Sequence, residues 1–181
     1  MAQFACSCGA FRAEIEPDGA RGGTHAICHC TYCRDHAERL GHPEAVGEAG
    51  GVRLYQSMPS RVRVTQGAEH LASMKLSARG PLRWYAACCG SPVAVTGPVR
   101  GIPMATLYAS GLPEGALGPL MFRVNTGSAT GPVPDDTPRF GLARGVARFS
   151  RWMAAERLTG RYKRTPFFDD AGNPVAEPSR P

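Results

Sequence analysis

All seven cysteines of the chain fall into three short clusters, and this placement constrains the fold more than any other feature of the sequence. We call them the first, central and last clusters, and they are Cys6-Ser7-Cys8-Gly9, Cys28-His29-Cys30-Thr31-Tyr32-Cys33-Arg34 and Cys88-Cys89-Gly90. Thiolates so close in sequence can converge on one point, and zinc is the usual reason in a reducing compartment. We therefore interpret the chain as a metal–thiolate protein that holds one or two zinc ions.

Composition is consistent with that interpretation. The first 20 residues contain no long apolar run, and no segment approaches the roughly 20 apolar residues that span a bilayer. We therefore expect a cytoplasmic protein without membrane contact, where thiols stay reduced. The odd number of cysteines also argues against a complete disulfide framework. With 22 Gly and 16 Pro among 181 residues, short strands and turns are favoured over a helix bundle.

Hydrophobic periodicity predicts a mainly β fold. Phe11, Ala13 and Ile15 alternate with charged residues, which predicts a strand with one buried face. The predicted strands are two within 3–16, and then 25–27, 52–55, 61–65, 71–76, 82–87, 93–95, 104–108 and 120–124.

Two helices are predicted. A short one follows the central cluster over 31–40, because Gly41 and Pro43 end the segment. An amphipathic one covers 139–158 and precedes an extended tail. Its apolar face is formed by Leu142, Val146, Phe149 and Met153. Its basic face is formed by Arg144, Arg148 and Arg151. We expect the apolar face to dock on the sheet.

The chain is expected to form one domain with three parts. Residues 1–97 would form a zinc-binding β core. Residues 98–138 would form an extension rich in Gly and Pro with added strands, and residues 139–181 the helix and the extended tail.

The first and last clusters are predicted to share one metal ion. Each ends in a glycine, which can adopt the positive φ of a tight turn and let backbone amides approach sulfur. Cys6, Cys8 and Cys89 are the expected ligands. Adjacent cysteines form a poor pair, because successive side chains of an extended chain point apart. The fourth ligand is then either Cys88, held in a distorted turn, or a water molecule. The alternatives are that this site holds no metal, or that Cys88 is a small buried hydrophobic residue and not a ligand.

The central cluster is predicted to form a different kind of site. Its C-x-C-x-x-C spacing places Cys28, Cys30 and Cys33 around one metal ion and leaves the fourth position free, as in catalytic or exchangeable sites. An open zinc can take a small thiol and lower its pKa, which makes the thiolate nucleophilic at neutral pH.

Neighbouring residues leave two alternatives open. His25, His29 or His36 would close the fourth position and make the central site structural. Arg34 is the candidate anchor for a substrate carboxylate, since its planar fork matches that geometry; otherwise it is an exposed helix residue. The segment Arg83-Trp84-Tyr85 is interpreted as a strand with one packed face rather than a ligand platform. The loop 42–51 is a candidate cover for the cluster.

The order of these motifs resembles the glutathione-dependent formaldehyde-activating enzyme and centromere protein V family, as a divergent bacterial branch. The family shows an early C-x-C-G, a middle C-H-C-x-x-C-R and a late aromatic-C-x-x-C-G-[ST]. The resemblance runs from about residue 3 to residue 95. The chain departs from the pattern at Ala86, where the family has a cysteine, and directly after Arg34.

The resemblance implies a fold, two zinc sites and an activity. The fold is a set of coiled antiparallel sheets called a β-tent. A structural zinc would be held by the first and last motifs, and an exchangeable zinc by the middle motif. The implied activity is the addition of formaldehyde to glutathione, giving S-(hydroxymethyl)glutathione, formally a carbon–sulfur lyase reaction in reverse.

The rival interpretation is a non-enzymatic, zinc-stabilised binding module that uses the basic helix as its contact surface. A nucleic-acid-binding zinc ribbon is disfavoured. The net charge is only +6, and the cysteine-containing region lacks aromatic residues interleaved with a basic groove.

Overall fold

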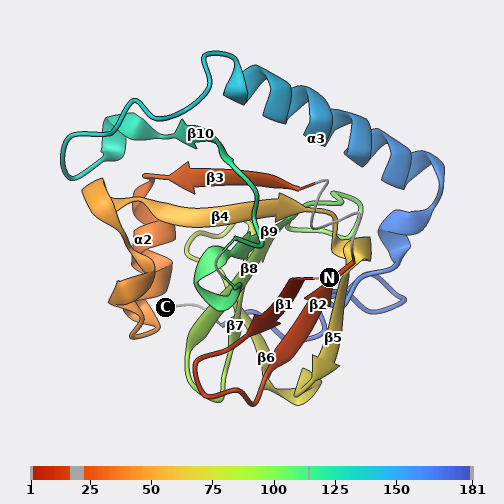
Figure 1. Cartoon of the computed structure of the whole chain (residues 1–181). Helices are drawn as coiled ribbons and strands as arrows, with labels where there is room; N and C mark the ends of the chain where they lie inside the picture. The colour runs from red at the N-terminus through yellow and green to blue at the C-terminus, as the bar shows by residue number, and fades with distance from the viewer. Residues whose placement is uncertain (1, 17–22, 114, 180–181) are drawn as a thin grey trace.

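The computed structural model describes residues 2–16, 23–113 and 115–179. Within these ranges the chain forms two β-sheets and two α-helices, joined by loops and single 3-10 turns (Figure 1). The strands are β1 (Ala2–Ala5), β2 (Arg12–Ile15), β3 (Thr24–Cys28), β4 (Val52–Ser57), β5 (Val62–Gln66), β6 (Leu71–Met74), β7 (Leu82–Ala86), β8 (Ser91–Thr96), β9 (Ala105–Tyr108) and β10 (Leu120–Val124). The helices are α2 (Thr31–Arg39) and α3 (Gly141–Leu158). The predicted mainly β class is therefore confirmed.

The two sheets differ in size. The small sheet has the order β1-β2-β5, and the large sheet has the order β10-β3-β4-β9-β8-β7-β6. Neighbouring strands are antiparallel except β10, which pairs in parallel with β3. The expectation of purely antiparallel sheets is thus wrong at this edge. β9 and β10 run in the same direction, and β4 and β3 lie between them in the sheet. The two strands therefore need a crossover connection instead of a tight hairpin.

The main core lies where the small sheet meets the large one. The alternation predicted for the second strand is confirmed, because Phe11, Ala13 and Ile15 are each at most 1% exposed. Trp84 of β7 and Leu107 of β9 are fully buried in the same core. Burying side chains of this size contributes roughly 1.5–3 kcal/mol each, so this core holds the two sheets together.

The segment after α3 lies against the large sheet and contributes to the core. The rings of Phe167 and Phe168 pack on Trp84, with centroid separations of 5.2 and 6.2 Å. The Ser179 amide donates to the carbonyl of Ser73 in β6 at 3.0 Å. The tail also contains a turn, in which the Gly172 amide donates to the Asp169 carbonyl, so it is less extended than the sequence suggests.

α3 lies along the edge strand β10 (Figure 1), and the predicted apolar face is only partly covered. Phe149 and Met153 are half-buried, whereas Leu142 and Val146 are 49% and 55% exposed. Gly141 and Gly145 are buried. A Cβ on Gly141 would overlap the Met121 carbonyl, and one on Gly145 the ring of Phe122. The glycines let the first turns of the helix approach the strand closely, in the part of the helix where Leu142 and Val146 stay exposed. No helix in the described part of the chain is long and apolar enough to cross a membrane.

Candidate metal centres

The first and last clusters meet at one point of the structure. We call Cys6, Cys8, Cys88 and Cys89 the outer group, and their sulfurs all lie within 4.8 Å of one another. Sulfur–sulfur distances are 3.6 Å for Cys6–Cys8, 3.8 Å for Cys6–Cys88, 3.4 Å for Cys8–Cys88 and 3.9 Å for Cys88–Cys89. A tetrahedral zinc with bonds of about 2.3 Å separates its sulfurs by about 3.8 Å. The outer group therefore fits a closed four-sulfur metal site.

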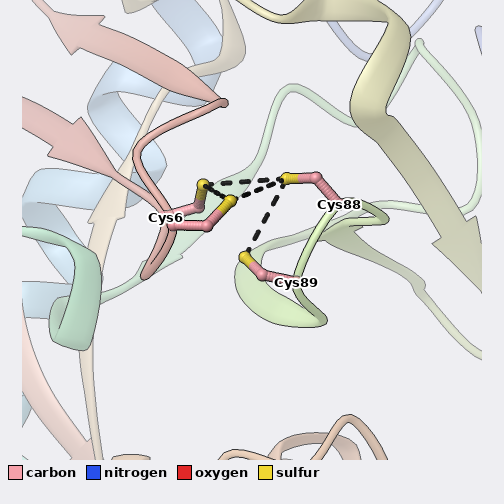
Figure 2. A group of neighbouring side chains, drawn as sticks. Cys6, Cys88 and Cys89 are labelled. Atoms are coloured by element: carbon pink, nitrogen blue, oxygen red, sulfur yellow. Dashed lines mark hydrogen bonds between the residues drawn. The ribbon is translucent and has the colours of Figure 1, made fainter.

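Two glycine-closed turns build the outer group (Figure 2). Gly9, with φ of 76°, closes the turn between β1 and β2, and Gly90, with φ of 77°, closes the turn between β7 and β8. At Gly90 a Cβ would also overlap the Leu40 carbonyl. Both turns direct their sulfurs toward each other from opposite sheets.

Cys88 is the member of the outer group whose role was hardest to predict from the sequence. Its sulfur contacts those of Cys6, Cys8 and Cys89, and the residue is exposed, so the alternative of a small buried hydrophobe is wrong. The rule that adjacent side chains point apart holds for extended backbone. Residues 87–90 form a turn instead, and the turn brings both sulfurs to one side.

Hydrogen bonds around the outer group favour a thiolate. Burial alone would raise the pKa of Cys89. Donors from Ser7, Ser91 and the backbone amides of Cys8 and Ser91 outweigh burial and lower that pKa to about 5. The Phe11 amide also donates to the Cys6 sulfur at 3.2 Å. Metal ligands need deprotonated sulfur, and these donors stabilise it.

The central cluster lies at the junction of β3 and α2. Cys28 ends the strand, Cys30 is the N-cap residue of the helix, and Cys33 lies in its first turn. Their three sulfurs lie within 4.8 Å of one another. The positive end of the helix dipole favours thiolates here. The central cluster therefore brings together three sulfurs that could bind a metal ion.

The interactions among the three thiols favour the thiolate at Cys28. Hydrogen bonds from Cys30 and Cys33 lower the pKa of Cys28 to about 2, whereas hydrogen bonds with Cys28 and Cys30, together with burial, raise the pKa of Cys33. The side-chain amide of Asn125 donates to the Cys28 sulfur at 3.2 Å. Asn125 has φ of 56°, a conformation that asparagine tolerates better than most residues. The residue after β10 thus supports a ligand in β3.

No histidine or carboxylate among the described residues joins the central cluster. The Nδ1 atoms of the three candidate histidines have other partners. His29 contacts the Ala49 carbonyl at 3.0 Å, His36 the Tyr108 hydroxyl at 2.8 Å, and His25 the Gly118 carbonyl at 3.1 Å. The described residues therefore supply three ligands here and no fourth.

Arg34, the predicted carboxylate anchor, lies among backbone carbonyls. Its Nη1 atom donates to the carbonyls of His29 at 2.7 Å, Ser128 at 2.9 Å and Gly50 at 3.4 Å. These bonds fasten the loop 42–51 and the turn after β10 to the start of α2. The loop suggested as a cover is thus held in place.

A cavity of about 160 Å³ opens beside the central cluster, lined by Cys30, Tyr32, Leu76, Ser77, Gly80, Pro81 and Arg83. Arg83 is 5% exposed, and its Nη1 donates to the Tyr108 hydroxyl at 3.4 Å. The expectation that this strand has one packed face is wrong, because Arg83 and Trp84 are both buried. Strand alternation was the available signal for Arg83, because it places this side chain on the face of β7 that the core residue Trp84 does not use.

The fold and the two cysteine groups define a mainly β protein whose cysteines could hold metal ions. The chain belongs to the family described as "Family of unknown function (DUF6151)", which matches residues 1–179. A search of curated proteins finds no match. Among solved structures the chain is similar to a crystal structure of a Rhodobacter sphaeroides protein, a structural genomics target. The identity is 22%, the match covers 67% of this chain and 99% of that chain, and the TM-score is 0.44.

Proposed function

We propose that this protein binds zinc at both cysteine groups and that the central site accepts a small thiol. One observation carries the proposal. The three sulfurs of the central cluster have no fourth protein ligand among the described residues, and Cys30 lines a cavity. The outer group supplies four sulfurs, which is the ligand set of a closed structural site. The compartment that fits such thiolate chemistry is the reducing cytoplasm.

The reaction that fits the central site is the addition of a small aldehyde such as formaldehyde to a thiol such as glutathione. The sulfur–carbon bond forms, the carbonyl π bond breaks, and the proton of the thiol ends on the oxygen, so no redox partner is needed. Bound zinc would supply the positive charge that favours the thiolate form. The motif resemblance to formaldehyde-activating enzymes supports this carbon–sulfur lyase class, and it suggests the β-tent arrangement for the two sheets.

The chain's own residues would divide the work. Cys28, Cys30 and Cys33 hold the metal, and Asn125 stabilises charge on Cys28 through its 3.2 Å hydrogen bond. Arg34 is a positioning residue, because it fastens the carbonyl of His29 between the first two ligands. The cavity beside Cys30 would hold the thiol close to the aldehyde, and proximity of this kind accelerates bimolecular reactions.

Metal content of two matched variants tests the two-site arrangement. Cys30→Ser removes a central ligand, and Cys88→Ser removes an outer one. We expect two zinc ions in the wild type and one in each variant, measured by elemental analysis. Cys30→Ser protein that retains the wild-type zinc content would contradict the central site.

Exchange-rate NMR of glutathione with formaldehyde tests the activity. Zinc-loaded wild-type protein should accelerate the exchange, and Cys30→Ser protein should not. Calorimetry with glutathione alone gives an independent measure of thiol binding. Absence of both acceleration and thiol binding in the zinc-loaded wild type would contradict the proposal.

A second candidate is a non-enzymatic binding module. The outward side of α3 carries the half-exposed apolar residues Leu142 and Val146 and the exposed residues Arg144 and Arg151. An anionic partner with an apolar segment would fit this combination. Loss of partner capture on Val146→Glu substitution, with zinc content unchanged, would favour this candidate.

A further inference from the structure

We propose that Arg83 determines which thiols the central site accepts, and that the preferred ligand is a small mercaptocarboxylate. Its sulfur would face the central cluster, and its carboxylate would bind the Arg83 guanidinium at the other side of the cavity. This inference rests on the proposed function and narrows it from thiols in general to short thiols that carry an acid group.

The first observation is the unbalanced charge of Arg83. The side chain is buried in β7, with 5% of the residue exposed. Among the described residues it has no ion-pair partner, and its one hydrogen bond goes to the neutral hydroxyl of Tyr108 at 3.4 Å. A guanidinium has five N–H donors, and a buried charge without a counter-ion is costly. An anion in the cavity would supply the missing partner.

The second observation is the position of that charge relative to the central cluster. Arg83 and Cys30 line the same cavity. The Tyr108 hydroxyl connects the two sides, because it accepts from Arg83 and lies 3.5 Å from the carbonyl of Cys33. A ligand whose sulfur approaches the cluster can therefore reach the guanidinium with its other end.

The third observation concerns the walls and the size of the cavity. Leu76 and Pro81 supply apolar surface to the lining of the cavity, and Tyr32 adds an aromatic residue. This surface suits one or two methylene groups between a sulfur and a carboxylate. The volume of about 160 Å³ is smaller than the roughly 300–1,000 Å³ of sites for drug-sized ligands. The cavity therefore favours a compact molecule over a tripeptide.

Arg83 could alternatively balance the metal site itself. Three thiolates and one Zn²⁺ carry a net charge of −1, which one guanidinium neutralises without any ligand carboxylate. The two roles differ in a measurable way. A carboxylate anchor discriminates between thiols with and without an acid group, whereas a counter-charge for the metal does not.

Calorimetry on zinc-loaded wild-type protein at pH 7 separates these roles with three probes. They are 3-mercaptopropionate, the matched thiol 3-mercapto-1-propanol, which lacks the carboxylate, and glutathione. We expect 3-mercaptopropionate to bind about tenfold or more tightly than the alcohol, the scale of one hydrogen-bonded charge pair. We also expect it to bind more tightly than glutathione.

Substitutions test whether the preference for a carboxylate depends on Arg83. Arg83→Gln should abolish the preference for the carboxylate while the alcohol still binds, and Arg83→Lys should retain part of it because the charge remains. Arg79→Gln, at a neighbouring exposed arginine, should leave the preference unchanged. Zinc content and circular dichroism identify variants that fail to fold, and the wild-type comparison of the two thiols needs no variant.

The failures are distinguishable. Equal affinities of wild-type protein for 3-mercaptopropionate and 3-mercapto-1-propanol would overturn the anchor and leave the thiol site intact. Tighter binding of glutathione than of 3-mercaptopropionate would overturn the compact ligand. No binding of any thiol to zinc-loaded protein would contradict the proposed function itself, and this inference with it.

Discussion

Arg83 and His36 both contact the hydroxyl of Tyr108. The hydroxyl accepts a hydrogen bond from Arg83 at 3.4 Å and lies 2.8 Å from His36 Nδ1. The other ring nitrogen, Nε2, is buried without a hydrogen-bond partner among the described residues. Burial first, and the charge of Arg83 second, lower the pKa of His36 to about 3. His36 is thus held neutral beside the central cluster.

We predict that His36 makes the fold sensitive to acid. In the folded protein its pKa of about 3 lies below the ordinary histidine value of 6.5. The contribution of the neutral ring to the free energy of unfolding is therefore complete above pH 6.5 and is lost as the pH falls toward 3. The slope is at most about 1.4 kcal/mol per pH unit. Urea denaturation between pH 7 and pH 5 should show about 2 kcal/mol more loss in the wild type than in His36→Gln.

His70→Gln is the matched control for that experiment, because His70 is partly exposed and its removal should keep the acid sensitivity of the wild type. Acid also protonates metal-ligating thiolates, but this contribution is common to all three proteins. Identical pH dependence in wild type and His36→Gln would show that the prediction is wrong.

At the residue scale the sequence predicted which cysteines converge better than it predicted their surroundings. The spacing within Cys28, Cys30 and Cys33 is local, so a strand followed by a helix is enough to bring their sulfurs together. Arg83 lies far along the chain, and its position beside Cys30 depends on how β7 packs near α2. No short motif encodes that packing. The left-handed Asn125 behind Cys28 was missed for the same reason.

At the scale of elements, α3 shows why a pattern can give the right helix and only part of its docking face. The predicted boundaries 139–158 agree with the observed helix Gly141–Leu158 to within two residues. Hydrophobic periodicity depends on apolar side chains, so it predicts no packing contact for a glycine. The helix docks through Gly141 and Gly145, which the pattern treats as weaknesses.

We predict that Gly145→Ala destabilises the protein, although alanine is the better helix former by about 1 kcal/mol. The added methyl would overlap the ring of Phe122, and overpacking of this kind costs about 1–3 kcal/mol. Gly127→Ala is the control, since nothing lies within 4 Å of its Cβ position. Urea denaturation measures both free energies of unfolding. A more stable Gly145→Ala protein would mean that helix propensity outweighs the contact.

At the scale of the whole molecule, the segment after α3 stabilises the large sheet by packing Phe167 and Phe168 on Trp84. We predict that Phe167→Ala lowers the free energy of unfolding by about 3–5 kcal/mol, as for buried phenylalanines generally. Phe167 is 1% exposed, whereas Phe140 is 58% exposed. Phe140→Ala should therefore cost much less. Comparable losses of unfolding free energy in the two variants would contradict the packing of Phe167 on Trp84.

The two cysteine groups should also differ in their effect on global stability. The outer group joins the two sheets across 80 residues of chain between Cys8 and Cys88, whereas the central cluster is local. Closing a long loop removes more conformational freedom from the unfolded chain. In the presence of zinc, calorimetry should therefore give a larger drop in melting temperature for Cys88→Ser than for Cys30→Ser. The reverse order would contradict a structural role for the outer group.

The parallel pairing of β10 with β3 has a consequence for biosynthesis. The Asn125 amide that supports Cys28 lies 97 residues after that cysteine, directly behind the strand that completes the sheet edge. At about 5–20 residues per second, the ribosome needs roughly 5–20 seconds to add them. The thiols of the central cluster therefore emerge well before the strand that shelters them. Metal delivery to the nascent chain would meet an open C-x-C-x-x-C motif, and the finished sheet would close around it afterwards.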